Sequence, residues 1–248
     1  MLEIKNLCVV KNKHNILSDV SFKVEKGKHT VLLGKNGSGK TTVLNCINGT
    51  TEYCGEILLS GGSLKEYSAR QKAQKIAFLP QLLSSPHIRV SELVSMGRTP
   101  HIDLGKRATR EDRDKVLEAI SAAGLEKIKD SYLDRISGGE LQRAYLGMVL
   151  AQDAELVVFD EPTSHMDIAA GEEFLSLANR LIFERGKTML TVIHDIGSAI
   201  RYCDNAVVLE DGRLAFFGAR EDCLNSGVIN SVFGVRSYEA EGRLFFGV

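Results

Sequence analysis

A phosphate-binding pattern occupies residues 34–41, which read GKNGSGKT. The stretch fits G-x-x-x-x-G-K-[ST] without a mismatch, and it lies between an apolar strand-like run and an apolar helix-like run. Glycines let the backbone turn tightly, so that successive N–H groups face phosphate oxygens, and the N-terminus of the following helix adds positive potential. The alternative, a glycine-rich turn with one stray lysine, is disfavoured by the complete pattern in this context. The pattern therefore predicts a nucleoside triphosphate site.

Two side chains of this loop have predicted chemical roles. Lys40 is expected to reach the β- and γ-phosphates, and the Thr41 hydroxyl is expected to bind Mg²⁺. The residues predicted to contact the nucleotide are Gly34, Lys35, Asn36, Gly37, Ser38, Gly39, Lys40, Thr41 and Thr42.

Two adjacent acids end an apolar run within ELVVFDEPTSHMD, residues 155–167. Neighbouring residues of a strand point to opposite sides, so Asp160 and Glu161 are free to take different roles. Asp160 is predicted to hold Mg²⁺ through its water shell, and Glu161 to polarise the attacking water as a general base. The alternative is a plain acidic exit from a strand, which is less favoured in a chain that also carries a phosphate loop.

A second glycine-rich element, ISGGELQR, spans residues 136–143. Ser137 and Glu140 are spaced as a helix capping box, which needs no ligand. A cap does not require Gly138 and Gly139, however, because glycine in the first helical positions costs stability. Exposed backbone at a helix N-terminus suits an anion, so we favour ligand binding over capping alone.

Two further polar residues end predicted strands. Gln81 follows the run FLP and is able to contact Mg²⁺ and water, while His194 follows TVI. A single glutamine or histidine at a strand end is more often a satisfied polar residue than a ligand. Both nevertheless lie at the carboxyl ends of predicted parallel strands, where α/β sheets place their ligands.

Alternating strand-like and helix-like segments predict an α/β fold. Continuous apolar runs such as VVFD and TVI indicate a mainly parallel sheet covered on both faces. Asp211-Gly212, between two apolar runs in residues 206–218, is a hairpin signal. The predicted strands are residues 2–10, 21–25, 29–34, 55–60, 75–80, 155–160 and 188–193.

Helices are predicted in the middle of the chain. Thr109 and Asp112 form a capping box at the start of residues 110–123, which end before Gly124. The side chains predicted to be buried there are Val116, Leu117 and Ile120. A second predicted helix, residues 138–152, repeats apolar residues along one face at Leu141, Ala144, Tyr145, Met148 and Val149. Residues 84–152 contain no clear strand, so a helical subdomain is predicted there.

Composition bounds the remaining possibilities. The chain has 248 residues, 44% of them hydrophobic, and a formal net charge of -1. Near-neutral charge argues against a general nucleic-acid surface, so no nucleic acid partner is expected. No apolar run is long enough to span a bilayer, and the N-terminus lacks a secretory pattern. The five cysteines have no disulfide or zinc spacing and are expected to be reduced thiols in a cytoplasmic protein.

The order and spacing of these elements resemble the ATPase subunits of the ABC type. The resemblance rests on GKNGSGKT, Gln81, ISGGE, LVVFDEP, the SHMD loop and His194, and it extends over essentially the whole chain. It implies one ABC ATPase domain, residues 1–248, with a P-loop NTPase core at 1–83 and 153–248 and an antiparallel β subdomain. Residues 84–152 would form the helical signature subdomain.

The resemblance also implies roles for individual residues. Ser137, Gly138, Gly139 and Glu140 would bind the γ-phosphate of ATP held by a second copy of the chain. Asp167 would lie in the loop that crosses between the copies, and His194 would sense the γ-phosphate. Gln81 would relay the nucleotide state to a polytopic membrane permease.

A finer resemblance links ELVSMGRTPHIDL (92–104), DEPTSHMDI (160–168) and HDIGSAIRYCD (194–204) to importers of metal chelates. These include importers of iron-siderophores, haem and cobalamin, in which the ATPase lies on the inner face of the cell membrane. A substrate-binding protein would be an indirect partner, and the permease and that protein would select the cargo.

One departure from the family concerns adenine. An aromatic residue usually stacks on the base, whereas Lys11 stands at that position. Weak discrimination between ATP and GTP is therefore expected. Other possibilities are an ATPase of a different ABC transporter, a soluble ABC ATPase of DNA repair or translation, and a P-loop kinase or GTPase-like switch. The last of these would leave the SGGE helix start without a role.

Overall fold

The computed structural model describes residues 1–164, 166–193, 195–240 and 243–247. The chain divides into two compact units, and each is described by itself below. The first unit combines residues 1–67 with residues 188–248, and the second is the continuous stretch 68–187.

An antiparallel sheet in the first unit has the strand order β2-β1-β4-β5. A two-residue turn joins β1 to β2, with Asn12 and Lys13 both at positive φ (51° and 65°), as in the tight turns of hairpins. The expected strand at 21–25 is thus part of a longer strand. The bounds are β1 Leu2–Lys11, β2 His14–Val24, β4 Cys54–Leu59 and β5 Gly62–Ser63.

A second sheet in the first unit carries the strand that leads into the phosphate loop. Its order is β10-β9-β3-β8, with β3 parallel to both neighbours and fully buried, as expected for a strand covered on both faces. The hairpin prediction at Asp211-Gly212 is confirmed, because both residues have positive φ between antiparallel β9 and β10. The bounds are β3 His29–Gly34, β8 Thr188–Val192, β9 Asn205–Glu210 and β10 Arg213–Ala219.

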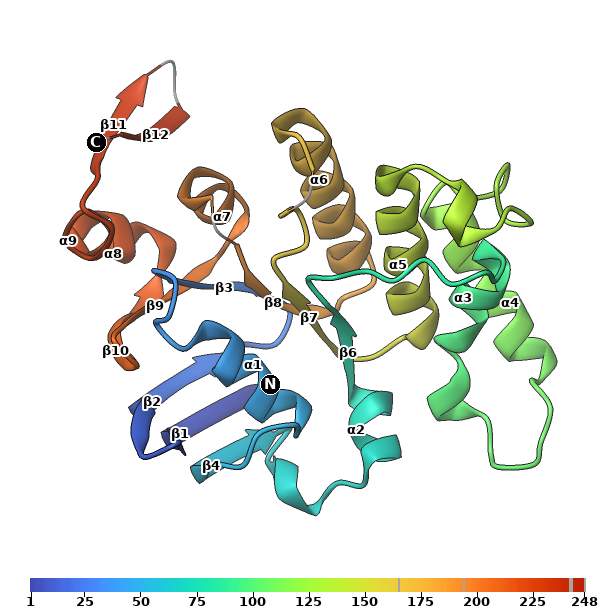
Figure 1. Ribbon diagram of the computed structural model, residues 1–248, viewed down its shortest axis with the longest axis horizontal. Helices are drawn as coiled ribbons and strands as arrows, with labels where there is room; N and C mark the ends of the chain where they lie inside the picture. Colours follow the sequence, from blue (N-terminus) through green and yellow to red (C-terminus); the bar gives the residue numbers. More distant parts are fainter. Residues whose placement is uncertain (165, 194, 241–242, 248) are drawn as a thin grey trace. The chain divides into compact units, whose positions relative to one another are not determined.

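Short helices and a terminal hairpin complete the first unit (Figure 1). The helix α1 follows the phosphate loop, the short helix η1 follows β5, and the remaining helices come after β8 and β10. The bounds are α1 Lys40–Asn48, η1 Leu64–Glu66, α7 Ile196–Tyr202, α8 Arg220–Asn225 and α9 Val228–Phe233, followed by β11 Arg236–Ala240 and β12 Arg243–Gly247.

The second unit joins a parallel strand pair, β6 and β7, to a group of helices. Figure 1 shows α3, α4 and α5 side by side, and the three pack on one another. Residues 84–152, all described, contain helices and one isolated bridge but no strand, as predicted. The bounds are α2 Ala69–Lys75, β6 Ile76–Leu79, α3 Val90–Met96, η2 Thr99–His101, α4 Arg110–Ala122, η3 Leu133–Arg135, α5 Gly138–Gln152, β7 Leu156–Asp160 and α6 Ile168–Glu184. Parallel strands, an antiparallel sheet and helices confirm the α/β class.

The predicted core of α4 is wrong at one position. The capping box formed by Thr109 and Asp112 is present, and Val116 and Ile120 are buried. Leu117, however, is 57% exposed. It follows Val116 by one residue, about 100° further round the helix, so it points away from the face that packs on α3 and α5.

The helix α5 is buried more evenly than one apolar face would require. Leu146 and Leu150 are buried, whereas the predicted core residues Leu141 and Met148 are only half-buried. The reason is that α3, α4, α6 and β6 all pack on α5, so that it is enclosed on several sides. In the part of the chain that the structure describes, no helix is both long and apolar enough to cross a membrane.

A buried ion pair connects three segments of the helical region. Arg98 donates from Nε to Asp112 Oδ1 over 3.0 Å and from Nη1 to the Ala151 carbonyl over 2.7 Å. The Asp112 carboxylate also accepts from the hydroxyl and the backbone N–H of Thr109. These hydrogen bonds from Thr109, with Arg98 beside them, lower the pKa of Asp112 to about 2.

Asp112→Asn should therefore destabilise the protein and change its response to acid. A depressed pKa gives stability that is fully present above the unfolded value of about 4 and lost as the pH falls through about 2. The variant should be less stable by about 3 kcal/mol at neutral pH, because Arg98 loses its buried partner, and it should lack this acid-dependent loss. Denaturant unfolding between pH 7 and pH 2 measures both effects.

The matched control is Asp114→Asn on the same helix. The Asp114 side chain is 65% exposed, so its substitution should change stability by less than about 0.5 kcal/mol. Equal effects of the two substitutions would contradict the role assigned to the buried pair.

Candidate functional site

The phosphate loop of the first unit has a backbone that depends on glycine. Gly37 and Gly39 have φ values of 82° and 100°, which side-chain-bearing residues rarely adopt. A Cβ at Gly39 would also lie 2.5 Å from Leu17 Cδ2 and 3.2 Å from the Ile16 carbonyl oxygen. The hairpin strand β2 therefore packs directly against the loop, and it leaves no room for a side chain at Gly39.

Lys40 and Ser38 are the buried polar side chains of this loop. Lys40 is 5% exposed, and its Nζ donates to the carbonyls of Gly34 (2.7 Å) and Lys35 (3.1 Å). The Ser38 hydroxyl is buried without a hydrogen-bond partner among the described residues. A buried ammonium and an unsatisfied hydroxyl beside the N-terminus of α1 fit an anionic ligand. Of the other predicted contacts, Lys35, Asn36, Gly37 and Thr41 are exposed, and Thr42 is half-buried.

Lys11 lies at the tip of the hairpin whose second strand touches the loop. It is paired with His14 across the two-residue turn, and both side chains are exposed. The described structure therefore has a cation and an imidazole at this tip, and the weak base discrimination inferred from Lys11 stays a prediction.

The two acids of the second unit lie at the carboxyl end of β7. Asp160 is the last residue of the strand and is half-buried. Glu161 is 8% exposed and lies just beyond the strand with φ 48°, an uncommon conformation for a non-glycine residue. Its direction is consequently set by this backbone conformation, and the alternation that holds within a strand does not extend to it. Gln81 Nε2 donates to Glu161 Oε2 over 2.5 Å, so these two predicted site residues are brought together.

The glycine-rich element of the second unit begins α5 with the predicted capping box. Ser137 Oγ accepts from the Glu140 N–H at 3.4 Å and donates to Glu140 Oε2 at 2.6 Å, and the Ser137 N–H also donates to this carboxylate. These bonds lower the pKa of Glu140. A Cβ on Gly138 or Gly139 would have no atom of the described chain within 4 Å. Packing inside the chain therefore does not explain why both positions are glycine.

A cavity of about 320 Å³ brings several of these residues together within the second unit. Its lining includes Gln81, Gly138, Gly139 and Asp167. Asp167 also caps α6, because its Oδ1 accepts from the Ala170 N–H at 2.8 Å. Asp167 thus has a structural role at the start of α6, and its predicted role between two copies stays a prediction.

Sequence reasoning did not single out Gln142, which is buried and donates from Nε2 to the Pro162 carbonyl. This bond connects α5 to the loop that follows Glu161. In the sequence, only the place of Gln142 within ISGGELQR pointed to a role for this residue. His194, predicted to sense the γ-phosphate, lies outside the described residues.

The predicted Mg²⁺ ligands have suitable chemistry. Thr41, Gln81 and Asp160 supply a hydroxyl, an amide and a carboxylate, all of them the hard oxygen donors that Mg²⁺ prefers. Among the described residues, no group of three or more histidine, cysteine or acidic side chains could hold a metal ion. A small number of protein ligands is what we expect for Mg²⁺, which is usually held largely by phosphates and water.

Known proteins match most of the chain. The family model described as ABC transporter matches residues 17–164. The ferric enterobactin transport ATP-binding protein FepC of Escherichia coli (strain K12) is 33% identical over 90% of this chain and 83% of its own length. The petrobactin import ATP-binding protein YclP of Bacillus subtilis (strain 168) is 34% identical, with 94% and 92% covered. The hemin import ATP-binding protein HmuV of Bordetella pertussis is 35% identical, with 95% and 93% covered.

Solved structures share the fold. A metal-chelate type ABC transporter in an inward-facing conformation matches with a TM-score of 0.82 at 24% identity, over 99% of this chain and 95% of that one. The ATP-binding cassette MJ0796, a dimer in a post-hydrolysis state bound to ADP and Pi, matches with a TM-score of 0.76 at 26% identity. That match covers 89% of this chain and 99% of the cassette.

Glu161→Gln should retain ATP binding and lower the turnover number about a hundredfold or more, because an amide cannot accept a proton from water. The glutamine oxygen can still accept the hydrogen bond from Gln81. Steady-state phosphate release and equilibrium nucleotide binding measure the two effects. Glu155→Gln, at the exposed beginning of the same segment, should leave turnover unchanged. Wild-type turnover in the Glu161 variant would remove this residue from the catalytic role.

Proposed function

The chain belongs to the ABC transporter family, and we propose that it is the ATP-hydrolysing subunit of an importer for a metal chelate such as a ferric siderophore or haem. The observation that carries this proposal is the set of relatives, named for ferric enterobactin, petrobactin and hemin transport, that match along nearly the whole chain. The segment ELVSMGRTPHIDL (92–104) and the phosphate loop both fall within residues 17–164, which the family model matches.

Each unit would contribute its own residues to ATP hydrolysis. Lys40 and the N–H groups at the start of α1 would bind the phosphates, and Glu161 would accept a proton from the attacking water. Thr41, Gln81 and Asp160 would hold Mg²⁺, which when bound neutralises charge on the phosphate oxygens. The short bond between Gln81 and Glu161 supports this assignment, because it orients the carboxylate before any nucleotide arrives.

The glycine pair at the start of α5 would act on a second copy of the chain. Gly138 and Gly139 leave open space that nothing in the described chain fills, and Asp167 lines the same cavity. In a two-fold dimer, each copy would offer this element to the ATP bound by the other, making two composite sites.

Mixing two inactive variants tests this arrangement. Lys40→Ala disables the phosphate loop and Ser137→Arg blocks the glycine pair, so each variant alone should be inactive. Half of the dimers in an equal mixture contain both variants and have one intact composite site, so ATPase activity should recover to about a quarter of wild type. If both elements served one site within a chain, mixing would restore nothing.

Obligatory cooperation between the two sites could also leave the mixture inactive, and a crosslink separates that case. Asn36→Cys in one copy and Ser137→Cys in the other should form an ATP-dependent bond between chains. A bond formed only within single chains would contradict the dimer.

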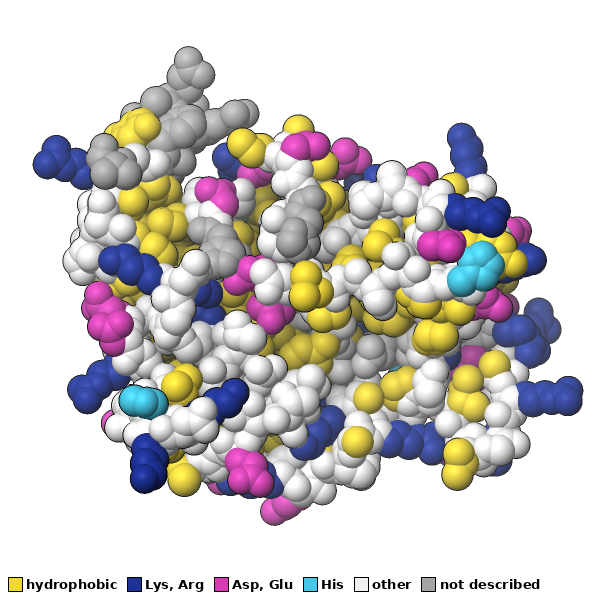
Figure 2. Space-filling model, viewed as in Figure 1, with side chains coloured by type: hydrophobic (Ala, Val, Ile, Leu, Met, Phe, Trp, Pro, Cys, Tyr) yellow, Lys and Arg dark blue, Asp and Glu magenta, His cyan; other side chains and the backbone are white. Residues whose placement is uncertain are grey.

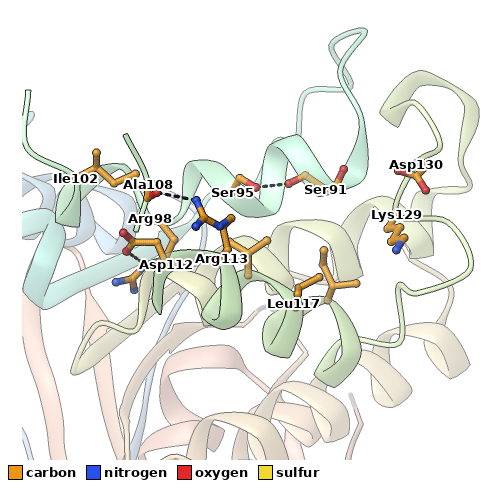
Figure 3. A pocket seen from close by; sticks show the side chains of 12 residues that line it. Ser91, Ser95, Arg98, Ile102, Ala108, Asp112, Arg113, Leu117, Lys129 and Asp130 are labelled. Carbon is orange, nitrogen blue, oxygen red and sulfur yellow. Dashed lines mark hydrogen bonds and ion pairs between the residues drawn. The ribbon is translucent and has the colours of Figure 1, made fainter. Parts of the chain in front are cut away.

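A polytopic permease is the proposed membrane partner, and it would place the protein at the cytoplasmic face of the membrane. A substrate-binding protein would then act indirectly, by delivering the chelate to the permease. An apolar groove in the second unit is the proposed contact with the permease. It has a volume of about 370 Å³ and lies between α3, α4 and residues 129–130 (Figure 3).

The groove is lined by both apolar and polar side chains. Leu117 contributes from α4, while Ser91 and Ser95 contribute from α3 (Figure 3). The buried Arg98–Asp112 pair forms part of the wall, and it holds the two sides of the groove together. Figure 2 shows apolar side chains on this part of the second unit, with lysine and arginine side chains around them. Such a surface suits a short amphipathic helix of a membrane protein.

Uptake measurements with variants of Leu117 test the proposed function. In source cells lacking the gene, plasmid-borne wild type should restore uptake of iron-labelled siderophore or haem, and Glu161→Gln should not. Leu117→Glu should lower uptake at least about tenfold, because a charge would be buried at the contact, while purified protein keeps its ATPase activity. The control is Leu104→Glu, since Leu104 is fully exposed and outside the groove lining.

Two results would contradict the proposal in distinguishable ways. Normal uptake in the gene-deleted cells would reject metal-chelate import. Restored uptake with Leu117→Glu, alongside failure with Glu161→Gln, would keep the transport function and reject the groove as the contact.

A further inference from the structure

The five cysteines fall into two groups. Burial raises the pKa of the Cys46 thiol to about 11, of Cys203 to about 12 and of Cys223 to about 11, so these three are poor nucleophiles at neutral pH. Cys54 is exposed and Cys8 is half-buried. Reagents in solution can therefore reach the second group and not the first.

A β-bulge places Cys8 and Cys54 opposite one another. The pairing of β1 with β4 runs regularly from Leu2↔Leu59 to Lys5↔Glu56, and the register then shifts by one residue. Without that shift Tyr53 would face Cys8, because the numbers of each regular pair sum to 61. With it, Cys8 is the direct partner of Cys54.

The bulge also turns both thiols to the outer face of the sheet. Asn6 has φ 48° and reverses the alternation along β1, since Ile4 is buried before it and Leu7 and Val9 are buried after it. Cys8, between two inward-facing residues, points outward, and its direct partner points to the same side. The backbone N–H of Asp19, on β2 at the other edge of β1, donates to Cys8 Sγ at 3.2 Å, so the Cys8 side chain must leave this hydrogen bond to turn toward Cys54 on β4.

Residues directly opposite in an antiparallel pair have Cα atoms about 4.5–5.5 Å apart. A disulfide needs Cα atoms about 4.4–6.8 Å apart, a range that includes the usual separation of directly opposite residues. Among the described residues, no other two cysteines are direct partners in a strand pairing.

We propose that Cys8 and Cys54 are a redox modification site, which a hydroperoxide converts reversibly into an intramolecular disulfide across β1 and β4. The exposed Cys54 thiol loses its proton, and the resulting thiolate attacks one peroxide oxygen. The O–O bond breaks, Cys54 becomes a sulfenic acid, and the departing hydroxide takes up that proton as the first water. The Cys8 sulfur then attacks the Cys54 sulfur, the S–O bond breaks, and the departing hydroxide takes the Cys8 proton as the second water. The two thiols together lose two electrons, and one hydrogen peroxide accepts them and is reduced to two waters.

The disulfide would close a loop around the phosphate-binding segment. The chain from residue 8 to residue 54 contains β2, β3, the phosphate loop and α1. Crosslinking its ends restricts the unfolded chain, which should raise the unfolding midpoint by about 10 °C for a loop of this length. Exposure and reversibility distinguish this bond from a permanent structural disulfide, because a thiol reductant can reach it.

The test treats the reduced, purified full chain with hydrogen peroxide. We expect an intact mass lower by two hydrogen atoms, a peptide that joins residues 8 and 54, and a higher unfolding midpoint that dithiothreitol reverses. Cys8→Ser should instead accumulate oxygen adducts on Cys54, and Cys54→Ser should form no disulfide. Cys223→Ala, at a buried thiol, should retain both the disulfide and the rise in the midpoint.

Three outcomes would overturn the proposal. They are oxygen addition to Cys54 in the wild-type chain without loss of hydrogen, a disulfide that joins two chains, and a disulfide that involves a buried cysteine. Peptide mapping of the wild-type protein distinguishes them without any variant, so a variant that fails to fold would not leave the question open.

Discussion

The first N–H groups of α1 have no carbonyl partner within their own helix, and the organisation of the first unit follows from that constraint. The loop that precedes α1 turns through left-handed glycines, so side chains are kept away from those donors. Leu17 packs against Gly39, and Lys40 Nζ donates hydrogen bonds to two carbonyls at the start of the loop. The buried strand β3, hydrogen-bonded on both edges, holds the start of this arrangement in place.

The same constraint has a different solution at α5. Ser137 and Glu140 already satisfy donors at this helix N-terminus, so an arriving anion would have to compete with a carboxylate in place. The lowered pKa of Glu140 keeps that carboxylate ionised, and its charge favours the helix while it opposes an anion. An element of this kind binds phosphate well only if further positive charge is supplied. The proposed second copy, with a lysine in its own phosphate loop, would supply it.

Motifs and turns were the parts of the fold most readable from sequence, because each depends on a few neighbouring residues. The Asp211-Gly212 hairpin and the Thr109–Asp112 capping box are local in this sense. Burial of Leu117 depended instead on which elements pack against α4, and periodicity alone does not contain that information. The enclosure of α5 and the hairpin at the C-terminal end of the chain were missed for the same reason.

In the candidate site, too, the sequence predicted individual residues but not the contacts that tertiary packing creates between them. Spacing identified Gln81 and Glu161 as separate residues eighty positions apart, but it did not predict that one donates a hydrogen bond to the other. That contact requires β6 and β7 to be adjacent and parallel, so that both chain segments leave the sheet at the same edge. It also requires the left-handed backbone at Glu161, which turns the side chain out of the strand's alternation. A non-glycine residue holds such a conformation only where its surroundings enforce it, and here Gln81 and the Gln142–Pro162 contact are the visible restraints. The carboxylate proposed as the general base is thus positioned by a strained backbone, and no pattern of residue types in the sequence encodes that strain.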